Sequence, residues 1–190
     1  MTEGLWAAII GVAGTLLGTF LGWVLNSWSN SGKLKVSTVD TQISFEKQDS
    51  IGSICRCDFD ESKCFILETK IDIYNNSSNT KIMKDIKILF LDKSKKVLKR
   101  IVPYDEDFTT FNRVYEYQKV CPLNIKAFTI TEKRFKWYAW KHEESYDYLI
   151  DTKSIILAYT NESGKTKKVA LKNLDGSDLF KQKLEEQNNG

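Results

Sequence analysis

The chain contains very little histidine: His142 is the single one among 190 residues. A catalytic triad or a histidine-rich metal site cannot be assembled from one imidazole unless carboxylates and thiols do most of the work. Beyond residue 25 the few glycines are isolated, so the sequence lacks a glycine-rich loop that would cradle a phosphate group. We therefore expect a protein that is not an enzyme and that uses no cofactor.

A large excess of basic charge is also missing. The 28 basic and 25 acidic residues leave a formal net charge of +3, whereas a dedicated nucleic-acid-binding domain carries a strong basic surplus. Duplex nucleic acid is therefore not an expected partner. Proline is scarce as well, with two residues. Together with frequent Ile, Val, Tyr, Phe and Thr, this scarcity favours a β-rich domain with few rigid turns.

The sequence does contain a long uncharged stretch, residues 5–25 (LWAAIIGVAGTLLGTFLGWVL), after a short flank at residues 1–4. A helix needs about 20 residues to cross the hydrocarbon core of a bilayer, and in lipid a lone segment satisfies its backbone hydrogen bonds only as a helix. The stretch therefore predicts one transmembrane helix. It is a poor cleavable signal peptide, because it lacks a basic leading region and its apolar run is too long.

The charges around this helix predict its orientation in the cell membrane. The preceding flank offers one acid, Glu3, whereas Lys33 and Lys35 follow the span closely. Basic residues near a membrane span favour the cytoplasmic side. We therefore expect a single-pass protein with its N-terminus outside and its C-terminal domain in the cytoplasm.

Small residues segregate to one face of the predicted helix, within an arc of roughly 120° on a helical wheel. They are Gly4, Ala7, Gly11, Gly14, Thr15, Gly18 and Gly22. Such a face lets two helix backbones approach closely, so we expect the helix to self-associate or to dock on a partner helix, with Thr15 and Thr19 adding hydrogen bonds. The alternative is a lone anchor, because glycine is common in membrane helices; random placement, however, would scatter the glycines.

The remainder of the chain has the pattern of one all-β domain. Residues 26–33 read as a linker, and residues 34–174 contain about nine short alternating segments separated by turn signals. Alternation of apolar and polar residues indicates antiparallel sheets with one buried face. The prediction is an immunoglobulin-like β-sandwich, with a small closed β-barrel as the alternative. Residues 175–190 read as a short C-terminal helix and tail.

Particular segments make this prediction specific. Residues 63–74 form the clearest strand, with apolar or threonine side chains at alternate positions, and residues 51–57 are expected to pair with them in a hairpin. The polar run at residues 75–79 is a turn cluster. Residues 153–160 and 166–171 are expected to form the closing hairpin.

Four cysteines leave three possibilities open. Cys55, Cys57 and Cys64 lie close in sequence, while Cys121 is distant. If the expected hairpin brought the first three together, they could ligate zinc, with Cys121 or His142 as a fourth ligand. Their spacing is not the usual zinc-knuckle spacing, however, and in a cytosolic domain free thiols behave as small apolar residues. Free thiols are therefore favoured over a metal site, and a disulfide would require the opposite topology.

Basic and aromatic side chains alternate in the stretch of residues 133–142. Such residues can stack on nucleobases while pairing phosphates, or lie against an anionic membrane surface. The favoured interpretation is a strand or short helix with its rings in the core and its lysines in water. If the domain has a ligand pocket, its basic lining is expected to include Lys133, Arg134, Lys136, Trp137, Trp140 and Lys141, together with Lys95, Lys96, Lys99 and Arg100.

Two segments, IIGVAGTLLGTFLGWVLN and LETKIDIYNNSSNTKIMKDIKILFLD, together resemble small, uncharacterised, membrane-anchored β-sandwich proteins of Gram-positive bacteria and their mobile elements. The layout is also similar to membrane effectors of bacterial antiviral defence, in which helices carry a β-rich sensing domain. Effectors of that type with a β-barrel usually have two helices, and this chain has one. The resemblance implies a membrane-anchored sandwich with a sensing role.

Three functions are consistent with these patterns. In the favoured one, a cytosolic sandwich binds a partner or ligand as a sensor or scaffold, and the glycine-faced helix assembles copies of the chain. The second is a membrane-perturbing effector whose helices rearrange into a pore when the domain is triggered. The third is a membrane-anchored enzyme, which would require a bound metal in an open cleft. The expected partners are a second copy of the chain, the lipid bilayer, and an unknown protein or small molecule.

Overall fold

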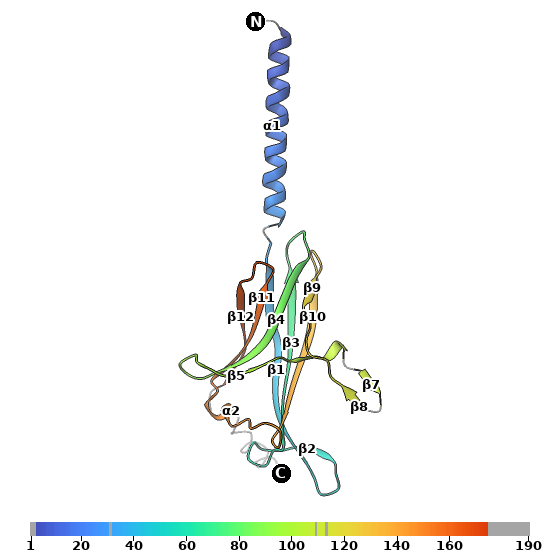
Figure 1. The fold of residues 1–190 in the computed structure, drawn as a ribbon, viewed down its shortest axis with the longest axis vertical. Coiled ribbons are helices and arrows are strands. Elements are labelled where there is room, and N and C mark those ends of the chain that lie inside the picture. Colours follow the sequence, from blue (N-terminus) through green and yellow to red (C-terminus); the bar gives the residue numbers. More distant parts are fainter. Residues whose placement is uncertain (1–2, 31, 109, 113, 175–190) are drawn as a thin grey trace, which may run out of the picture.

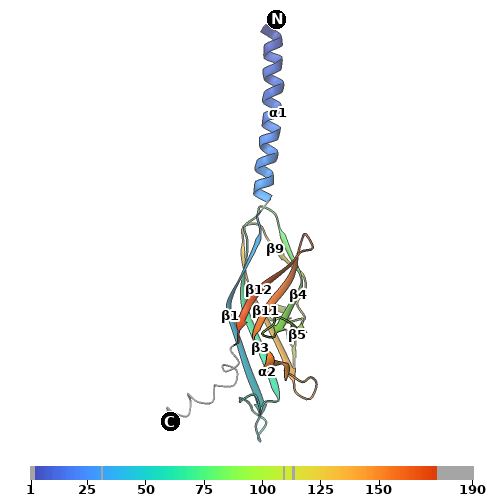
Figure 2. The same ribbon diagram turned by 90° about the vertical axis from the view of Figure 1, so that its left-hand side faces the viewer.

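The computed structural model describes residues 3–30, 32–108, 110–112 and 114–174. A long helix stands on one end of an elongated β-domain, as Figures 1 and 2 show from two directions. The predicted C-terminal helix, residues 175–190, lies outside the described residues.

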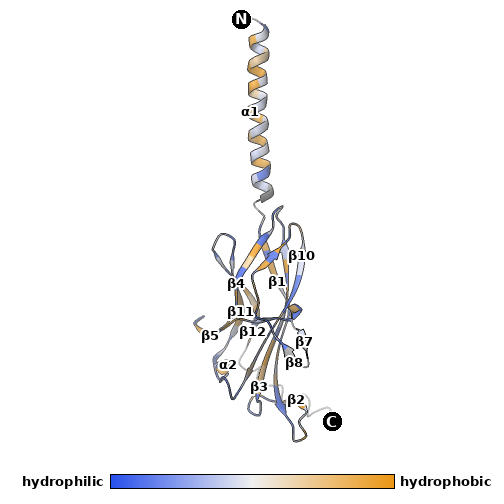
Figure 3. Cartoon of the chain, turned by 45° about the vertical axis from the view of Figure 1, so that its right-hand side comes forward, coloured by the Kyte–Doolittle hydropathy of each residue, from blue (hydrophilic) through white to orange (hydrophobic). Residues whose placement is uncertain are grey.

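The predicted N-terminal helix is present and is longer than expected. Helix α1 covers Glu3–Asn30, and its stretch Glu3–Trp28, 26 residues, is long and apolar enough to cross a membrane. Figure 3 shows apolar and neutral colours along most of it. The prediction of a linker from residue 26 is wrong in its start, because residues 26–30 contain neither glycine nor proline and the helix continues through Asn30.

The β-domain consists of two antiparallel sheets, which confirms the predicted sandwich. The first sheet has the order β2-β1-β3-β10-β6. Its strands are β1 (Leu34–Gln48), β2 (Ile54–Arg56), β3 (Cys64–Asn75), β6 (Tyr104–Asp105) and β10 (Ile130–Trp140). The second has the order β12-β11-β4-β5, with β9 also paired to β4. Its strands are β4 (Lys81–Leu91), β5 (Val97–Ile101), β9 (Leu123–Ile125), β11 (Ser154–Asn161) and β12 (Thr166–Asn173).

Shorter elements complete the domain. A separate hairpin is formed by β7 (Thr110–Asn112) and β8 (Val114–Glu116), next to the 3-10 turn η1 (Glu106–Phe108). A single helical turn, α2 (Tyr148–Asp151), precedes β11.

The core lies between the two sheets and follows the period-two pattern of the sequence. On β3 the side chains of Phe65, Leu67, Ile71 and Ile73 have no exposed surface, as their alternation predicts. They pack against inward side chains of the second sheet, among them Phe90. Full burial of each such side chain stabilises the fold by roughly 1.5–3 kcal/mol.

The predicted hairpin between residues 51–57 and 63–74 is wrong. Strand β1 lies between β2 and β3, so that Glu46 is opposite Arg56 on one side and opposite Cys64 on the other. The turn after β1 explains this pairing, because the Asp49 carboxylate accepts hydrogen bonds from the N–H groups of residues 51 and 53. This turn reverses the chain before β2, whereas the predicted hairpin placed the reversal between β2 and β3.

The two ends of the sandwich are formed by different turns. The turns β3–β4, β9–β10 and β11–β12 lie at the end from which α1 emerges, whereas the β1–β2 hairpin and α2 lie toward the other end (Figure 1). We call these the membrane-proximal and distal ends. The chain itself fixes this arrangement, because residues 31–33 alone separate α1 from β1.

Candidate membrane-proximal binding site

The small-residue face of α1 is open in the structure. A Cβ atom added at Gly11, Gly14, Gly18 or Gly22 would meet no neighbouring atom within 4 Å. The hydroxyl of Thr15 donates to the carbonyl oxygen of Gly11, at 2.9 Å, so its hydrogen bond is made within its own helix. Self-association through this face stays a prediction.

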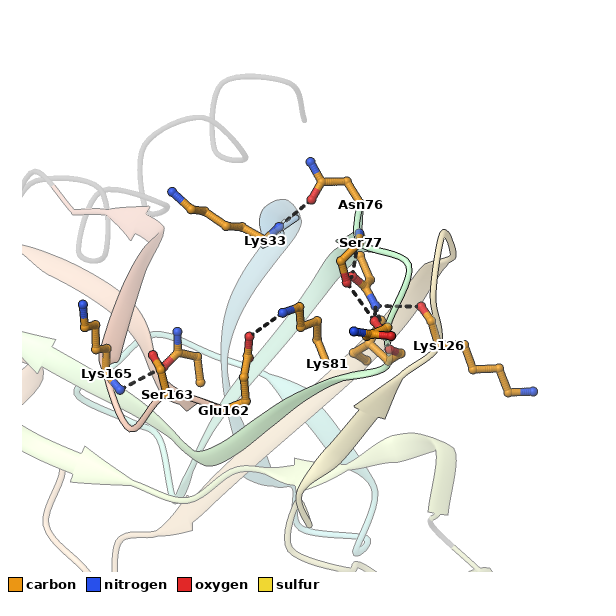
Figure 4. Close-up of polar contacts among 12 residues, drawn as sticks. Lys33, Asn76, Ser77, Lys81, Lys126, Glu162, Ser163 and Lys165 are labelled. Atoms are coloured by element: carbon orange, nitrogen blue, oxygen red, sulfur yellow. Dashed lines mark hydrogen bonds and ion pairs between the residues drawn. The ribbon is translucent and has the colours of Figure 1, made fainter. Parts of the chain in front are cut away.

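The junction between α1 and the sandwich is closely packed. A Cβ atom added at Gly32 would lie 2.4 Å from the carbonyl oxygen of Asn76 and 2.5 Å from the Cα of Ser77. The backbone N–H of Lys33 donates a 2.6 Å hydrogen bond to the side-chain Oδ1 of Asn76 (Figure 4). The sequence therefore needs glycine at this position because the β3–β4 turn leaves no room for a side chain.

A buried asparagine holds that turn in shape. Asn75 has no exposed surface, and its Nδ2 donates to the carbonyl oxygens of Asn79, Ile125 and Lys126 at 2.8–3.0 Å. Its Oδ1 accepts from the backbone N–H and the hydroxyl of Ser77, at 3.0 and 2.7 Å. One amide side chain therefore links the β3–β4 turn to the β9–β10 turn, as expected of a fully satisfied buried polar group.

The β9–β10 turn is attached to the same structure. The backbone N–H of Phe128 donates to the carbonyl oxygen of Ser77 at 3.3 Å, and that of Asn75 donates to Thr129 at 3.0 Å. Residues 32–33, 75–79 and 126–129 thus form one hydrogen-bonded unit, which we call the membrane-proximal platform. Helix α1 joins the domain through this platform.

A pocket of about 440 Å³ opens beside the platform. Its lining comes from the beginnings of β1 and β4 and from the β11–β12 hairpin. It includes the four lysines Lys33, Lys81, Lys165 and Lys167, and the single acid Glu162. The lining suits a small anion, because lysines from three segments that are distant in sequence border the same pocket.

The single acid of the pocket is already engaged. Lys81 Nζ lies 2.8 Å from Glu162 Oε1, and the Lys81 side chain is 13% exposed (Figure 4). Partial burial raises the pKa of the Glu162 carboxyl, but the hydrogen bond from Lys81, a backbone hydrogen bond and the charge of Lys81 together outweigh it, so this pKa lies below its ordinary value. Glu162 therefore stays ionised and neutralises Lys81 rather than the other lysines.

The basic and aromatic stretch predicted as a possible ligand lining lies on β10. Phe135 is fully buried, which confirms the expected strand with a ring in the core. Lys133 lies within 3.3 Å of Asp105 and 2.6 Å of Asp107, and its side chain is 12% exposed. Lys136 pairs with Glu68. These two ammonium groups are therefore matched by carboxylates, which differs from the expectation that the lysines lie in water.

The other candidate basic residues are distributed differently. Arg134 lines a shallow pocket together with acidic side chains. Trp137 stacks on Tyr104, with ring centroids 5.5 Å apart, and Lys141 lies exposed at the distal end. Among the β4–β5 residues, Lys99 pairs with Glu144.

The cysteines are free. Because β1 separates β2 from β3, Cys55 is opposite Lys47 and Cys64 is opposite Glu46 rather than another cysteine. Within the described part of the chain, no group of three or more His, Cys, Asp or Glu side chains has the arrangement of a metal site. Burial raises the pKa of the Cys64 thiol to about 11, which leaves it unreactive at neutral pH.

The pocket was missed at the sequence level. Lys33 was noted only as a membrane flank, whereas Lys81 begins β4 and Lys165 lies in the β11–β12 turn, and the two share no motif. The signal that could have found them is positional: each lysine lies beside a turn at the end of the sandwich that carries the helix. That signal requires the topology, which local patterns do not supply.

This geometry can now be set beside known proteins. The model of the YopI Ig-like domain family matches residues 32–172; this is well over half of the chain, so the chain belongs to that family. No curated protein matches.

Solved structures show weaker similarity. One is the ApaA protein of Bordetella pertussis, 11% identical with a TM-score of 0.37, covering 76% of this chain and 93% of that one. A β-sandwich protein of Clostridium difficile 630 is 16% identical with a TM-score of 0.34, covering 74% and 86%. The Iho670 flagellar-like filament is 8% identical with a TM-score of 0.34, covering 90% and 98%.

Proposed function

We propose that this member of the YopI Ig-like family is a non-enzymatic, single-pass membrane protein that acts as a scaffold or sensor. Its helix self-associates through the glycine face, and its sandwich is presented at the bilayer surface to bind a partner or ligand. The proposal does not extend to antiviral defence, because the comparisons give that resemblance no support.

The observation that carries the proposal is the packed junction at Gly32. A helix that served only as a tether could be joined to its domain by a flexible linker. Here the backbone of residue 32 lies against Asn76 and Ser77 with no space for a methyl group, and Lys33 is hydrogen-bonded to Asn76. Association of the helices would therefore also fix the spacing and orientation of the sandwiches, which is what a scaffold requires.

The open glycine face supplies the means of association. Lipid provides no hydrophobic force between helices, so close backbone contact at small residues is the main source of attraction. Gly14, Gly18 and Gly22 present their Cα atoms without obstruction. We place the sandwich in the cytoplasm, since Lys33 and Lys35 follow the span.

The non-enzymatic part of the proposal is supported by the position of the one histidine. The side chain of His142 is 73% exposed, and its neighbour Glu143 lies 3.7 Å away in the same exposed loop. A general base works best in a site that excludes water and holds its substrate. His142 has neither feature.

The test is the mass of the full chain in detergent, for the wild type and for Gly14→Leu/Gly18→Leu. A discrete oligomer that the double variant loses supports the proposal. The matched control, Val12→Leu/Leu16→Phe, adds bulk to the opposite face and should keep the oligomer. A monomeric wild type, or equal loss in the control, would rule out assembly through this face.

A further inference from the structure

The membrane-proximal end lies close to lipid as a consequence of chain connectivity. Residues 31–33 separate the end of α1 from the start of β1, and a fully extended residue spans at most about 3.6 Å. The start of β1 therefore stays within roughly 15 Å of the helix end. If α1 spans the bilayer, the platform and its pocket face the headgroup layer.

The pocket carries uncompensated positive charge. Glu162 is engaged by Lys81 at 2.8 Å, and the described residues place no carboxylate within ion-pairing distance of Lys33, Lys165 or Lys167. Near an anionic leaflet such lysines are attracted at close range and are screened only beyond a Debye length of about 8–10 Å. The charge therefore fits a phosphate-bearing group.

Apolar side chains accompany this charge at the same end of the domain. Phe128, at the β9–β10 turn, is 64% exposed, and Ile130 is 70% exposed. Phe128 has a φ of +52°, a left-handed conformation that costs a non-glycine residue roughly 1–2 kcal/mol. The hydrogen bond from its N–H to Ser77 holds the turn in that shape. An exposed ring at the same end of the domain as a group of lysines is a combination that binds the boundary between headgroups and acyl chains.

We propose that the membrane-proximal end is a lipid-binding face: the phosphate of an anionic phospholipid occupies the pocket among Lys33, Lys165 and Lys167, while Phe128 enters the lipid layer. The sandwich is thereby held against the membrane in which α1 is anchored. This inference rests on the anchoring of α1 but not on helix self-association, so the two tests fail independently.

The experiment compares hydrogen–deuterium exchange of the full chain in bilayer nanodiscs of phosphatidylcholine alone with that in discs where phosphatidylserine replaces about a third of the lipid. We expect slower exchange at residues 126–130 and 161–165 in the anionic discs, and no difference along β3. Lys165→Gln/Lys167→Gln should weaken docking on the order of tenfold and remove the difference. Phe128→Ser should remove the difference in exchange between the two kinds of disc at residues 126–130.

The matched control is Lys63→Gln/Lys141→Gln, which removes two exposed lysines from the distal end. It should behave as the wild type. Equal exchange in the two lipids, or an equal loss in the control, overturns the proposal. Inorganic phosphate added to the detergent-solubilised protein separates the two sources of the anion. If phosphate alone protects residues 161–165 as strongly as anionic discs do, the pocket is a free-phosphate site and the lipid assignment is wrong.

Discussion

The backbone N–H of Lys33 donates a 2.6 Å hydrogen bond to the side chain of Asn76, 43 positions further along the chain. Lys33 lies between the end of α1 and the start of β1, whereas Asn76 belongs to the turn that reverses β3 into β4. The contact therefore joins the anchor to the two strands that supply much of the core, and not to β1 alone.

Replacing Gly32 with alanine should destabilise the sandwich. The added methyl would lie 2.4 Å from the Asn76 carbonyl oxygen, and overpacking of this kind costs about 1–3 kcal/mol. Chemical denaturation of the full chain in detergent measures the loss. Gly14→Ala is the control, because its methyl meets nothing within 4 Å. Equal stability of the two variants would show that the junction is not packed as described.

Asn75→Ala should be more damaging. The change removes a side chain that satisfies three carbonyl groups and two donors in the turns. Buried groups left without partners cost about 1–3 kcal/mol each, so we expect the free energy of unfolding to fall by roughly 3 kcal/mol. Asn124→Ala, at an exposed position of β9, is the control. If Asn75→Ala lost less unfolding free energy than Asn124→Ala, a structural role for the Asn75 network would be excluded.

Lys133→Met should destabilise the domain near neutral pH. Its ammonium group pairs with Asp105, whose side chain is 2% exposed, and removing one partner of a buried ion pair costs about 3–5 kcal/mol. Lys136→Met is the control and should cost less, because its partner Glu68 is 45% exposed.

The stability loss caused by Lys133→Met should also depend on pH. Burial opposes the charged form of Lys133, but the hydrogen bond from its ammonium to Asp107 and the charge of Asp105 outweigh it, so its pKa lies above the ordinary 10.5. A raised folded pKa gives stabilisation that is fully present below the unfolded pKa and lost as pH rises through the folded one. The difference in unfolding free energy between wild type and Lys133→Met should therefore shrink above about pH 10.5. A constant difference from pH 7 upward would contradict this assignment.

The four thiols should differ in reactivity. Cys121 is exposed, and Cys64 is buried with a pKa raised to about 11. Because the thiolate is the reactive form, timed alkylation at about pH 8, followed by mass spectrometry, should label Cys121 first and Cys64 last. In Cys121→Ser the fast step should disappear. Rapid labelling of Cys64 would mean that the distal end of β3, between β1 and β10, opens readily.

The sequence predicted those parts of the fold that depend on residues close together in the chain, namely the strands and their buried faces. The alternation from Phe65 to Ile73 is a local pattern, and the strand and its buried face follow from it directly. The pairing of β2 was predicted wrongly because residues 49–53 and 58–62 both have turn composition, and composition does not select a pairing partner. The hydrogen bonds that the Asp49 carboxylate accepts in the first of these turns select β1 as the partner of β2.

The candidate site was less accessible to sequence reasoning, since it depends on long-range placement. Lys133 was expected to lie in water, but the chain between β5 and β10 returns Asp105 to the edge of the sheet beside it. The lysines of the pocket come together in the same way, from β1, β4 and the β11–β12 hairpin. No local spacing encodes either arrangement.

The strand that follows the anchor also has a mechanical consequence. Strand β1 runs from the junction toward the distal end and is paired with β3 from Leu34 opposite Asn75 to Glu46 opposite Cys64. Hydrogen bonds between antiparallel strands lie perpendicular to them, so a force between the anchor and a partner holding the far end of β3 loads this ladder in shear. The bonds then share the load and must break together rather than one after another. A sandwich joined to α1 in this way should resist tension along its long axis better than a ladder loaded one bond at a time.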